Sequence, residues 1–220
     1  MKFSAYNDRL NKYVKLVLRG DSMKIILASA SPRRKEILEN AGLKFKVVKS
    51  DIEETVFEDE TPEELVKRLS HEKAAYIADK NRAELVIGSD TVVAIDGKIL
   101  GKPADEKEAY NMLKMLSGRE HYVTTGVSMI NREKGIDVTN HCTSSVKFKN
   151  LSDSDIYDYI STGEFKDKAG SYGIQGFGAV LVEYIKGDYF NIVGFPISMA
   201  SDMMKESFGI NIFTGSGLSE

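Results

Sequence analysis

The sequence predicts an α/β fold built on a mixed β-sheet, and two patterns support this prediction. Strand-like and helix-like segments alternate along most of the 220 residues, as they do in α/β domains. Short turns typical of antiparallel hairpins occur in the same chain as helices long enough to connect parallel strands. We therefore expect parallel and antiparallel strands in one elongated sheet with flanking helices, bent into two lobes around a cleft.

The first half of the chain contains elements with clear starts and stops. A short apolar strand at 25–28 is followed by a helix, because Ser31 suits the N-cap and Pro32 suits the first helical position. Ala41-Gly42 indicates the end of this helix. The next elements are a strand, a helix, a strand and a helix, at residues 45–48, 62–78, 85–95 and 105–116. After the second of these strands, Asp96-Gly97 indicates a two-residue hairpin turn.

The second half of the chain is richer in strand-like sequence. Its predicted elements are two strands, a short helix, a glycine-rich loop and a final helix, at residues 122–130, 138–148, 152–160, 163–178 and 196–208. Residues 179–193 are predicted to form a second hairpin, which turns at Lys186-Gly187-Asp188.

Two terminal segments lie outside the predicted domain, which spans residues 23–212. Residues 1–22 are polar and mildly basic, and they lack the apolar stretch of a secretion signal. We interpret them as a disordered extension, either an added tag or a native appendage. Residues 213–220 are small and polar and are expected to form a flexible tail.

The composition argues against several classes of protein. The net charge of −3 does not favour a broad nucleic-acid-binding surface. The single cysteine, Cys142, cannot form an internal disulfide, and no apolar run has the length of a membrane span. We therefore expect a cytoplasmic protein with no stable nucleic-acid complex and no membrane contact.

The start of the first helix is a candidate phosphate site. Free backbone N–H groups at a helix start attract anions, and Arg33 and Arg34 would add two planar cations beside them. The alternative is an ordinary helix start with exposed arginines.

Two charged side chains interrupt apolar patterns. Lys73 falls inside the apolar stripe of helix 62–78, where an ammonium needs an anionic partner or a route to water. Asp90 lies within an apolar strand, where a carboxylate is costly unless it faces a site. Together with Asp90, the carboxylates of Glu53 and Glu54 could hold a divalent cation, which prefers oxygen ligands.

Later segments add weaker signals. Lys102 follows the first hairpin, and on its own it does not indicate a site. Thr91 could either contact a ligand or pack in its strand. The segment 169–178 matches neither a dinucleotide-binding fingerprint nor a P-loop, although its glycines would let backbone approach a ligand. Within it, Gln175 could read a nucleobase edge, since its amide both donates and accepts; a flexible surface loop is the alternative. Cationic and acidic side chains together are typical of sites that hold a polyphosphate with a metal.

The order and spacing of these motifs resemble those of the Maf family, the septum-formation-inhibitor-like nucleotide pyrophosphatases. The resemblance covers residues 23 to about 209. It rests on Ser29-Ala30-Ser31-Pro32-Arg33-Arg34, Glu53-Glu54, Glu72-Lys73, Ser89-Asp90-Thr91, Gly101-Lys102-Pro103 and Gly173-Ile174-Gln175-Gly176.

The resemblance implies a fold like that of inosine-triphosphate pyrophosphatases and hydrolysis of a nucleoside triphosphate to the monophosphate and pyrophosphate. By this resemblance Asp90 would be the proton acceptor, and Glu54 and Asp90 would hold a divalent cation, Mg²⁺, Mn²⁺ or Co²⁺. The residues that would bind substrate are Ser29, Arg33, Arg34, Lys73 and Lys102. The residues that would set specificity are Arg33, Arg34, Thr91 and Gln175.

The motifs also resemble one branch of the family in particular. Asp90-Thr91 and Gly173–Gly176 match the branch that acts on dTTP and UTP rather than the one that acts on 7-methyl-GTP. By analogy with the family, a homodimer is expected. The competing interpretation is a nucleotide-binding regulator of cell division without turnover, although a pure polyphosphate binder gains little from acidic side chains near anionic oxygens.

Overall fold

Strand β3 lies near the centre of a seven-stranded mixed sheet in the computed structural model, which describes residues 23–57 and 59–218. The strand order is β2-β1-β3-β5-β6-β7, and β4 pairs with β3 outside this path. The strands are β1 (Ile25–Ala28), β2 (Phe45–Val47), β3 (Leu85–Ile95), β4 (Lys98–Leu100), β5 (Glu120–Asn131), β6 (Ile136–Phe148) and β7 (Val182–Lys186). Strands β2, β1 and β3 are parallel, whereas all other pairs are antiparallel, so the predicted mixed α/β fold is confirmed.

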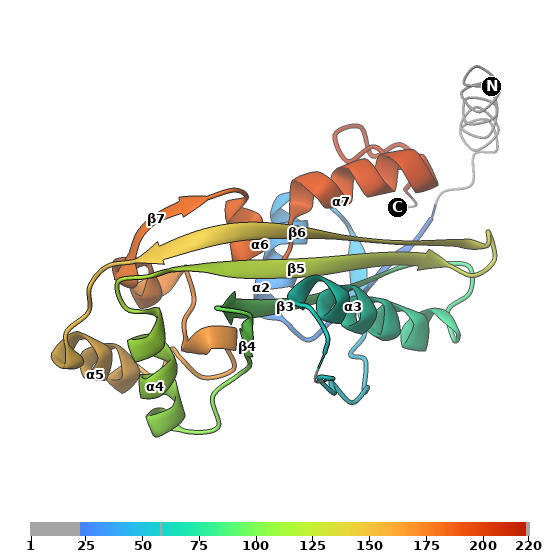
Figure 1. The fold of residues 1–220 in the computed structure, drawn as a ribbon. Helices are drawn as coiled ribbons and strands as arrows, with labels where there is room; N and C mark the ends of the chain where they lie inside the picture. Colours follow the sequence, from blue (N-terminus) through green and yellow to red (C-terminus); the bar gives the residue numbers. More distant parts are fainter. Residues whose placement is uncertain (1–22, 58, 219–220) are drawn as a thin grey trace, which may run out of the picture.

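Helices cover both faces of this sheet, and the long β5–β6 hairpin extends along the molecule (Figure 1). The helices are α2 (Pro32–Asn40), α3 (Pro62–Ala78), α4 (Glu106–Leu116), α5 (Asp153–Ser161), α6 (Tyr189–Val193) and α7 (Ile197–Met203), which continues as one wider turn over Met204–Phe208. Within the described residues no helix is long and apolar enough to cross a membrane.

Helix α3 packs unusually close to one face of the sheet. A Cβ atom at Gly126 would overlap the carbonyl oxygen of Val66, and one at Gly88 would overlap that of Ser70. These two glycines therefore bring the backbone of α3 down onto β3 and β5, which also places Lys73 against the sheet. The larger apolar core lies on the other face, beneath α2 and α7.

A gap in the sheet determines where a site can form. Strand β3 pairs with β1 over Leu85–Gly88 and with β4 over Val93–Ile95. Within the described part of the chain, no strand pairs with this edge of β3 at residues 89–92. Because side chains alternate along a strand, Asp90 points to the α3 face while Thr91 points to the opposite face. Side chains from both faces can therefore reach one opening at this gap.

The predicted hairpin at 179–193 is wrong. Within residues 23–57 and 59–218, strand β7 pairs with β6 alone, and the residues after the turn form α6 instead of a returning strand. Asp188 starts this helix, because its carboxylate accepts a hydrogen bond from the backbone N–H of Phe190 at 2.8 Å. Strand β3 has the predicted bounds, 85–95, and runs through the polar residues 89–91 that interrupt its apolar pattern.

The first and last residues of the described part of the chain lie side by side. The predicted extension, 1–22, lies outside the described residues. Of the predicted tail, Leu218 forms an isolated bridge with Met23, whose N–H donates to the carbonyl of Gly217 at 3.0 Å. The flexibility of residues 213–220 stays a prediction.

Candidate active site

A cleft of about 910 Å³ opens at the gap beside β3. It is lined by the end of β1, the first turn of α2, one side of α3, residues 90–93 of β3 and the loop 164–176. A cleft of this size can hold a nucleotide. The residues that the family resemblance assigns to the site all line it, namely Ser29, Arg33, Arg34, Glu54, Lys73, Asp90, Thr91, Lys102 and Gln175. Glu53, by contrast, is exposed and does not line the cleft.

An ammonium joins the two carboxylates on one side of the cleft. Lys73 is only 7% exposed, and its Nζ lies 2.6 Å from Oδ1 of Asp90 and 2.7 Å from Oε1 of Glu54. Burial raises the pKa of Glu54, but the hydrogen bond and charge of Lys73, with the charge of Lys102, outweigh it and hold that pKa below its usual range. The anionic partners that the buried Lys73 requires are thus carboxylates of the cleft itself.

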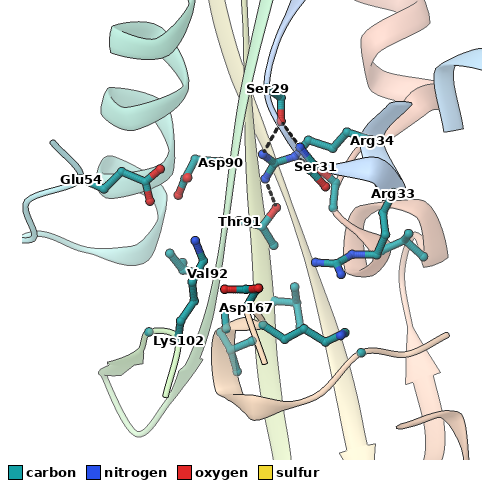
Figure 2. Close-up of a pocket in the computed structure, with 18 of the residues that line it drawn as sticks. Ser29, Ser31, Arg33, Arg34, Glu54, Asp90, Thr91, Val92, Lys102 and Asp167 are labelled. Atoms are coloured by element: carbon teal, nitrogen blue, oxygen red, sulfur yellow. Dashed lines mark hydrogen bonds between the residues drawn. The ribbon is translucent and has the colours of Figure 1, made fainter. Parts of the chain in front are cut away.

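The opposite side of the cleft carries the two arginines (Figure 2). Arg34 is held by the protein: its Nε donates to the carbonyl of Gly194 at 2.9 Å, and its terminal nitrogens donate to Ser29 Oγ at 3.3 Å and Thr91 Oγ1 at 3.0 Å. Burial lowers the pKa of Arg34, and the negative charge of Asp90, which raises that pKa, offsets this effect only in part. Three acceptors in a fixed arrangement make Arg34 a rigid part of the wall.

Arg33 is presented differently from its neighbour. It projects from the first turn of α2 towards the cleft, and no hydrogen bond or ion pair to its guanidinium is present within the described residues (Figure 2). Its planar donors are therefore available to an anionic ligand. Ser31 occupies the predicted N-cap position without capping through its side chain; its N–H instead donates to Ser29 Oγ at 3.2 Å.

Several charged side chains of the cleft were missed in the sequence. Glu164, Asp167 and Lys168 all come from the loop after α5. Burial lowers the pKa of Lys168, and the positive charge of Arg33 lowers it further, which places these two cations near each other. No pattern in the sequence distinguishes these residues from ordinary loop charges, since only the fold brings the loop to the gap beside β3.

The donor set fits a divalent cation only together with substrate. Within residues 23–57 and 59–218, no group of three or more His, Cys, Asp or Glu side chains is arranged to hold a metal. Glu54 and Asp90 nevertheless supply two carboxylates at one place. Since Mg²⁺ at phosphate-handling sites is usually bound by one or two carboxylates plus substrate phosphates, this pair is compatible with it.

Comparison with known proteins identifies the family. The sequence model of a family described as Maf-like protein matches residues 24–207. The chain belongs to the Maf family. The resemblance of its motifs to this family is thereby confirmed.

Curated members of the family resemble the chain along most of its length. It is 57% identical over 193 residues to a "dTTP/UTP pyrophosphatase" of Clostridioides difficile, which covers 88% of this chain and 100% of that protein. It is 48% identical over 189 residues to a protein of the same name from Caldanaerobacter subterraneus, covering 86% and 91% respectively. Among solved structures, the Staphylococcus aureus Ham1 protein matches with a TM-score of 0.46 and 15% identity, over 88% of this chain and 93% of that one.

Proposed function

We propose that this Maf-family protein is a nucleoside triphosphate pyrophosphatase that hydrolyses dTTP and UTP to the monophosphate and pyrophosphate. The observation that carries the proposal is the cleft that sets the Asp90 carboxylate opposite the guanidinium of Arg33, which has no partner among the described residues (Figure 2). Relatives that are 57% and 48% identical bear the name of this activity. Such an enzyme removes pyrimidine triphosphates from the nucleotide pool.

The cations of the cleft are proposed to hold the triphosphate. Arg33 and Lys102 are available for this, since neither side chain has a hydrogen bond or ion pair within the described residues and Lys102 extends from the loop after β4 towards Glu54 (Figure 2). Arg34, fixed by Ser29 and Thr91, would offer its remaining N–H groups in a set direction. Preorganised donors of this kind stabilise the charge that develops on phosphate oxygens.

Asp90 is proposed to accept a proton from the attacking water. Lys73 holds Oδ1, which leaves Oδ2 for the proton. The water oxygen forms a bond to the α-phosphorus, and the bond from that phosphorus to the oxygen bridging to the β-phosphorus breaks. The proton of the water goes to Asp90, and pyrophosphate leaves.

A divalent cation, Mg²⁺, Mn²⁺ or Co²⁺, is proposed to be held by Glu54 and Asp90 together with substrate oxygens. When bound, it would neutralise charge on the phosphates. Because Lys73 is paired with both carboxylates, nucleotide phosphates that attract Lys73 would free them for the cation.

Base selection is proposed to involve Gln175 and Thr91. Gln175 lines the cleft and has both a donor and an acceptor for the edge of thymine or uracil. Thr91 acts in a different way, because its hydroxyl already contacts Arg34 and lies 2.9 Å from Thr125 Oγ1. Its contribution to specificity would come from fixing Arg34 rather than from touching the base.

Pyrophosphate release from a panel of nucleoside triphosphates tests this function. We expect release from dTTP and UTP at rates at least tenfold above those from dATP, dGTP and dCTP, in the presence of Mg²⁺ or Mn²⁺. Release of orthophosphate alone, or tight binding without release across the panel, would contradict it; the second result would favour a nucleotide-binding regulator.

A homodimer in the cytoplasm, without nucleic-acid or membrane partners, completes the proposal. Light scattering that gives the mass of one chain at micromolar concentration would overturn the dimer.

A further inference from the structure

The carboxylate of Glu164 is surrounded by the glycine-rich loop. Its Oε2 accepts a hydrogen bond from the N–H of Phe177 at 2.9 Å, and its Oε1 accepts one from the N–H of Gly178 at 3.1 Å. Hydrogen bonds to an ionised acceptor are stronger than neutral ones. One side chain that follows α5 therefore fixes the far end of the loop.

The glycines of this loop are explained by contacts within the protein. At Gly176, which has a φ of 64°, a Cβ atom would lie 2.7 Å from Oε2 of Glu164. At Gly178 a Cβ atom would overlap the carbonyl oxygen of Gly173. These two glycines let the loop close around the carboxylate of Glu164 and upon itself, and the approach of the loop backbone to a ligand stays a prediction.

Gln175 lies between the two fixed ends of this loop. At the near end, the N–H of Gly173 is directed at the hydroxyl of Tyr159 at 3.4 Å, and Ile174 is buried in the core. At the far end, the two bonds to Glu164 begin only two residues after Gln175. The side chain of Gln175 lines the cleft, so its position depends on both ends of the loop.

We propose that Glu164 is a positioning residue for base recognition, which holds the loop 173–178 so that Gln175 meets the pyrimidine edge. This proposal rests on the proposed function, since it concerns how that site selects its base. Without the carboxylate, the exposed N–H of Phe177 and the part-buried N–H of Gly178 would both lose their acceptor, and the loop would move so that the N–H of Gly178 could bond to water. Glutamine could satisfy only one of them, because its amide nitrogen is itself a donor.

The test compares Glu164→Ala and Glu164→Gln with a matched control, Glu183→Gln. Glu183 is an exposed glutamate of β7 that does not line the cleft. Hydrogen exchange measures the amides of Phe177 and Gly178, and steady-state kinetics measure dTTP against dCTP. We expect E164A to speed exchange at both amides by roughly tenfold or more, and to raise KM for dTTP by roughly tenfold. The value of kcat should stay within about threefold, since Asp90 and Lys73 are untouched. E164Q should be intermediate and E183Q unchanged.

A double-mutant cycle separates positioning from general loosening. If Glu164 acts through Gln175, then Gln175→Ala should reduce the preference for dTTP over dCTP, and adding E164A should reduce it no further. Additive losses, an unchanged preference in E164A, or unchanged exchange at Phe177 and Gly178 would each overturn the proposal. Unfolding midpoints of all variants confirm that the fold is kept, and E164Q serves if E164A does not fold.

Failure of the proposed function gives a different pattern from failure of this inference. If the wild-type protein releases no pyrophosphate, base preference is measured by binding of α,β-methylene dTTP and dCTP to the same variants. A preference for the dTTP analogue that E164A removes would support the role of Glu164 without turnover. Equal binding of both analogues by the wild-type protein would overturn it.

Discussion

The ammonium of Lys73 lies 2.6 Å from Oδ1 of Asp90, so the proposed proton acceptor is paired with a buried cation. The same ammonium lies 2.7 Å from Oε1 of Glu54, the second proposed metal ligand. In the free protein, Lys73 therefore pairs with the same two carboxylates that would hold a divalent cation. Binding of metal and the position of Lys73 should be coupled.

Lys73→Gln should increase the affinity of the nucleotide-free protein for Mn²⁺ by roughly tenfold, because two carboxylates lose their internal counter-charge. The loss of free Mn²⁺ signal in electron paramagnetic resonance measures this binding without any turnover. Lys46→Gln, at an exposed lysine of β2 outside the cleft, is the control. Weaker Mn²⁺ binding in K73Q than in the wild-type protein would show that Lys73 does not compete with the metal.

Substitution of the two adjacent arginines should change different properties of the protein, substrate binding for Arg33 and stability for Arg34. Arg33→Ala should raise KM for dTTP by roughly tenfold or more and leave stability within about 0.5 kcal/mol, because this guanidinium has no partner in the described residues. Arg34→Ala should lower the free energy of unfolding by about 1–3 kcal/mol, because the carbonyl of Gly194 and the hydroxyl of Thr91 each lose one of their hydrogen bonds.

Denaturant unfolding combined with steady-state kinetics separates the two effects. A stability loss in R33A equal to that in R34A would contradict the distinction between a ligand-facing and a wall-forming arginine.

A buried histidine behind the cleft should make stability depend on pH. His121 is fully buried, and burial lowers its pKa from 6.5 to about 4. The unfolded chain therefore binds a proton that the folded protein does not bind between these two values. Stability is fully present above pH 6.5 and is lost as the pH falls towards 4, by up to about 3 kcal/mol in total.

His121→Gln should remove most of this dependence. Nε2 of His121 lies 2.8 Å from the hydroxyl of Tyr172, which glutamine can also reach as donor or acceptor. Thermal unfolding from pH 7 to pH 4.5 checks the prediction. Equal slopes for the variant and the wild-type protein would mean that another group controls the loss.

Local sequence rules predicted most of the fold because the elements carry their own signals. The helices predicted at 62–78 and 105–116 and the Asp96-Gly97 turn all form, and the two helices are capped by Thr61 and Asp105. The hairpin prediction at 179–193 failed because strand propensity alone does not reveal where a strand finds its partner. Strand β7 had the free edge of β6 available, and Asp188 could start a helix.

The site was predictable as a set of residues but not as a set of contacts. Lys73 and Asp90 stood out because a charge inside an apolar pattern needs a reason, whereas nothing local shows that they bind each other. Glu164 gave no signal at all, since it is one charge in a polar loop. Its importance comes from the fold, which wraps backbone N–H groups around it.

The most direct test of the account is pyrophosphate release from dTTP by Asp90→Asn compared with the wild-type protein. The asparagine oxygen can still accept from Lys73, so the fold should be kept, and unchanged thermal unfolding would verify this. Because the amide cannot take a proton from water, we expect turnover to fall by a factor on the order of 10³ while nucleotide binding stays within a few-fold. Turnover by D90N near that of the wild-type protein would contradict the central role of Asp90 and the mechanism built on it.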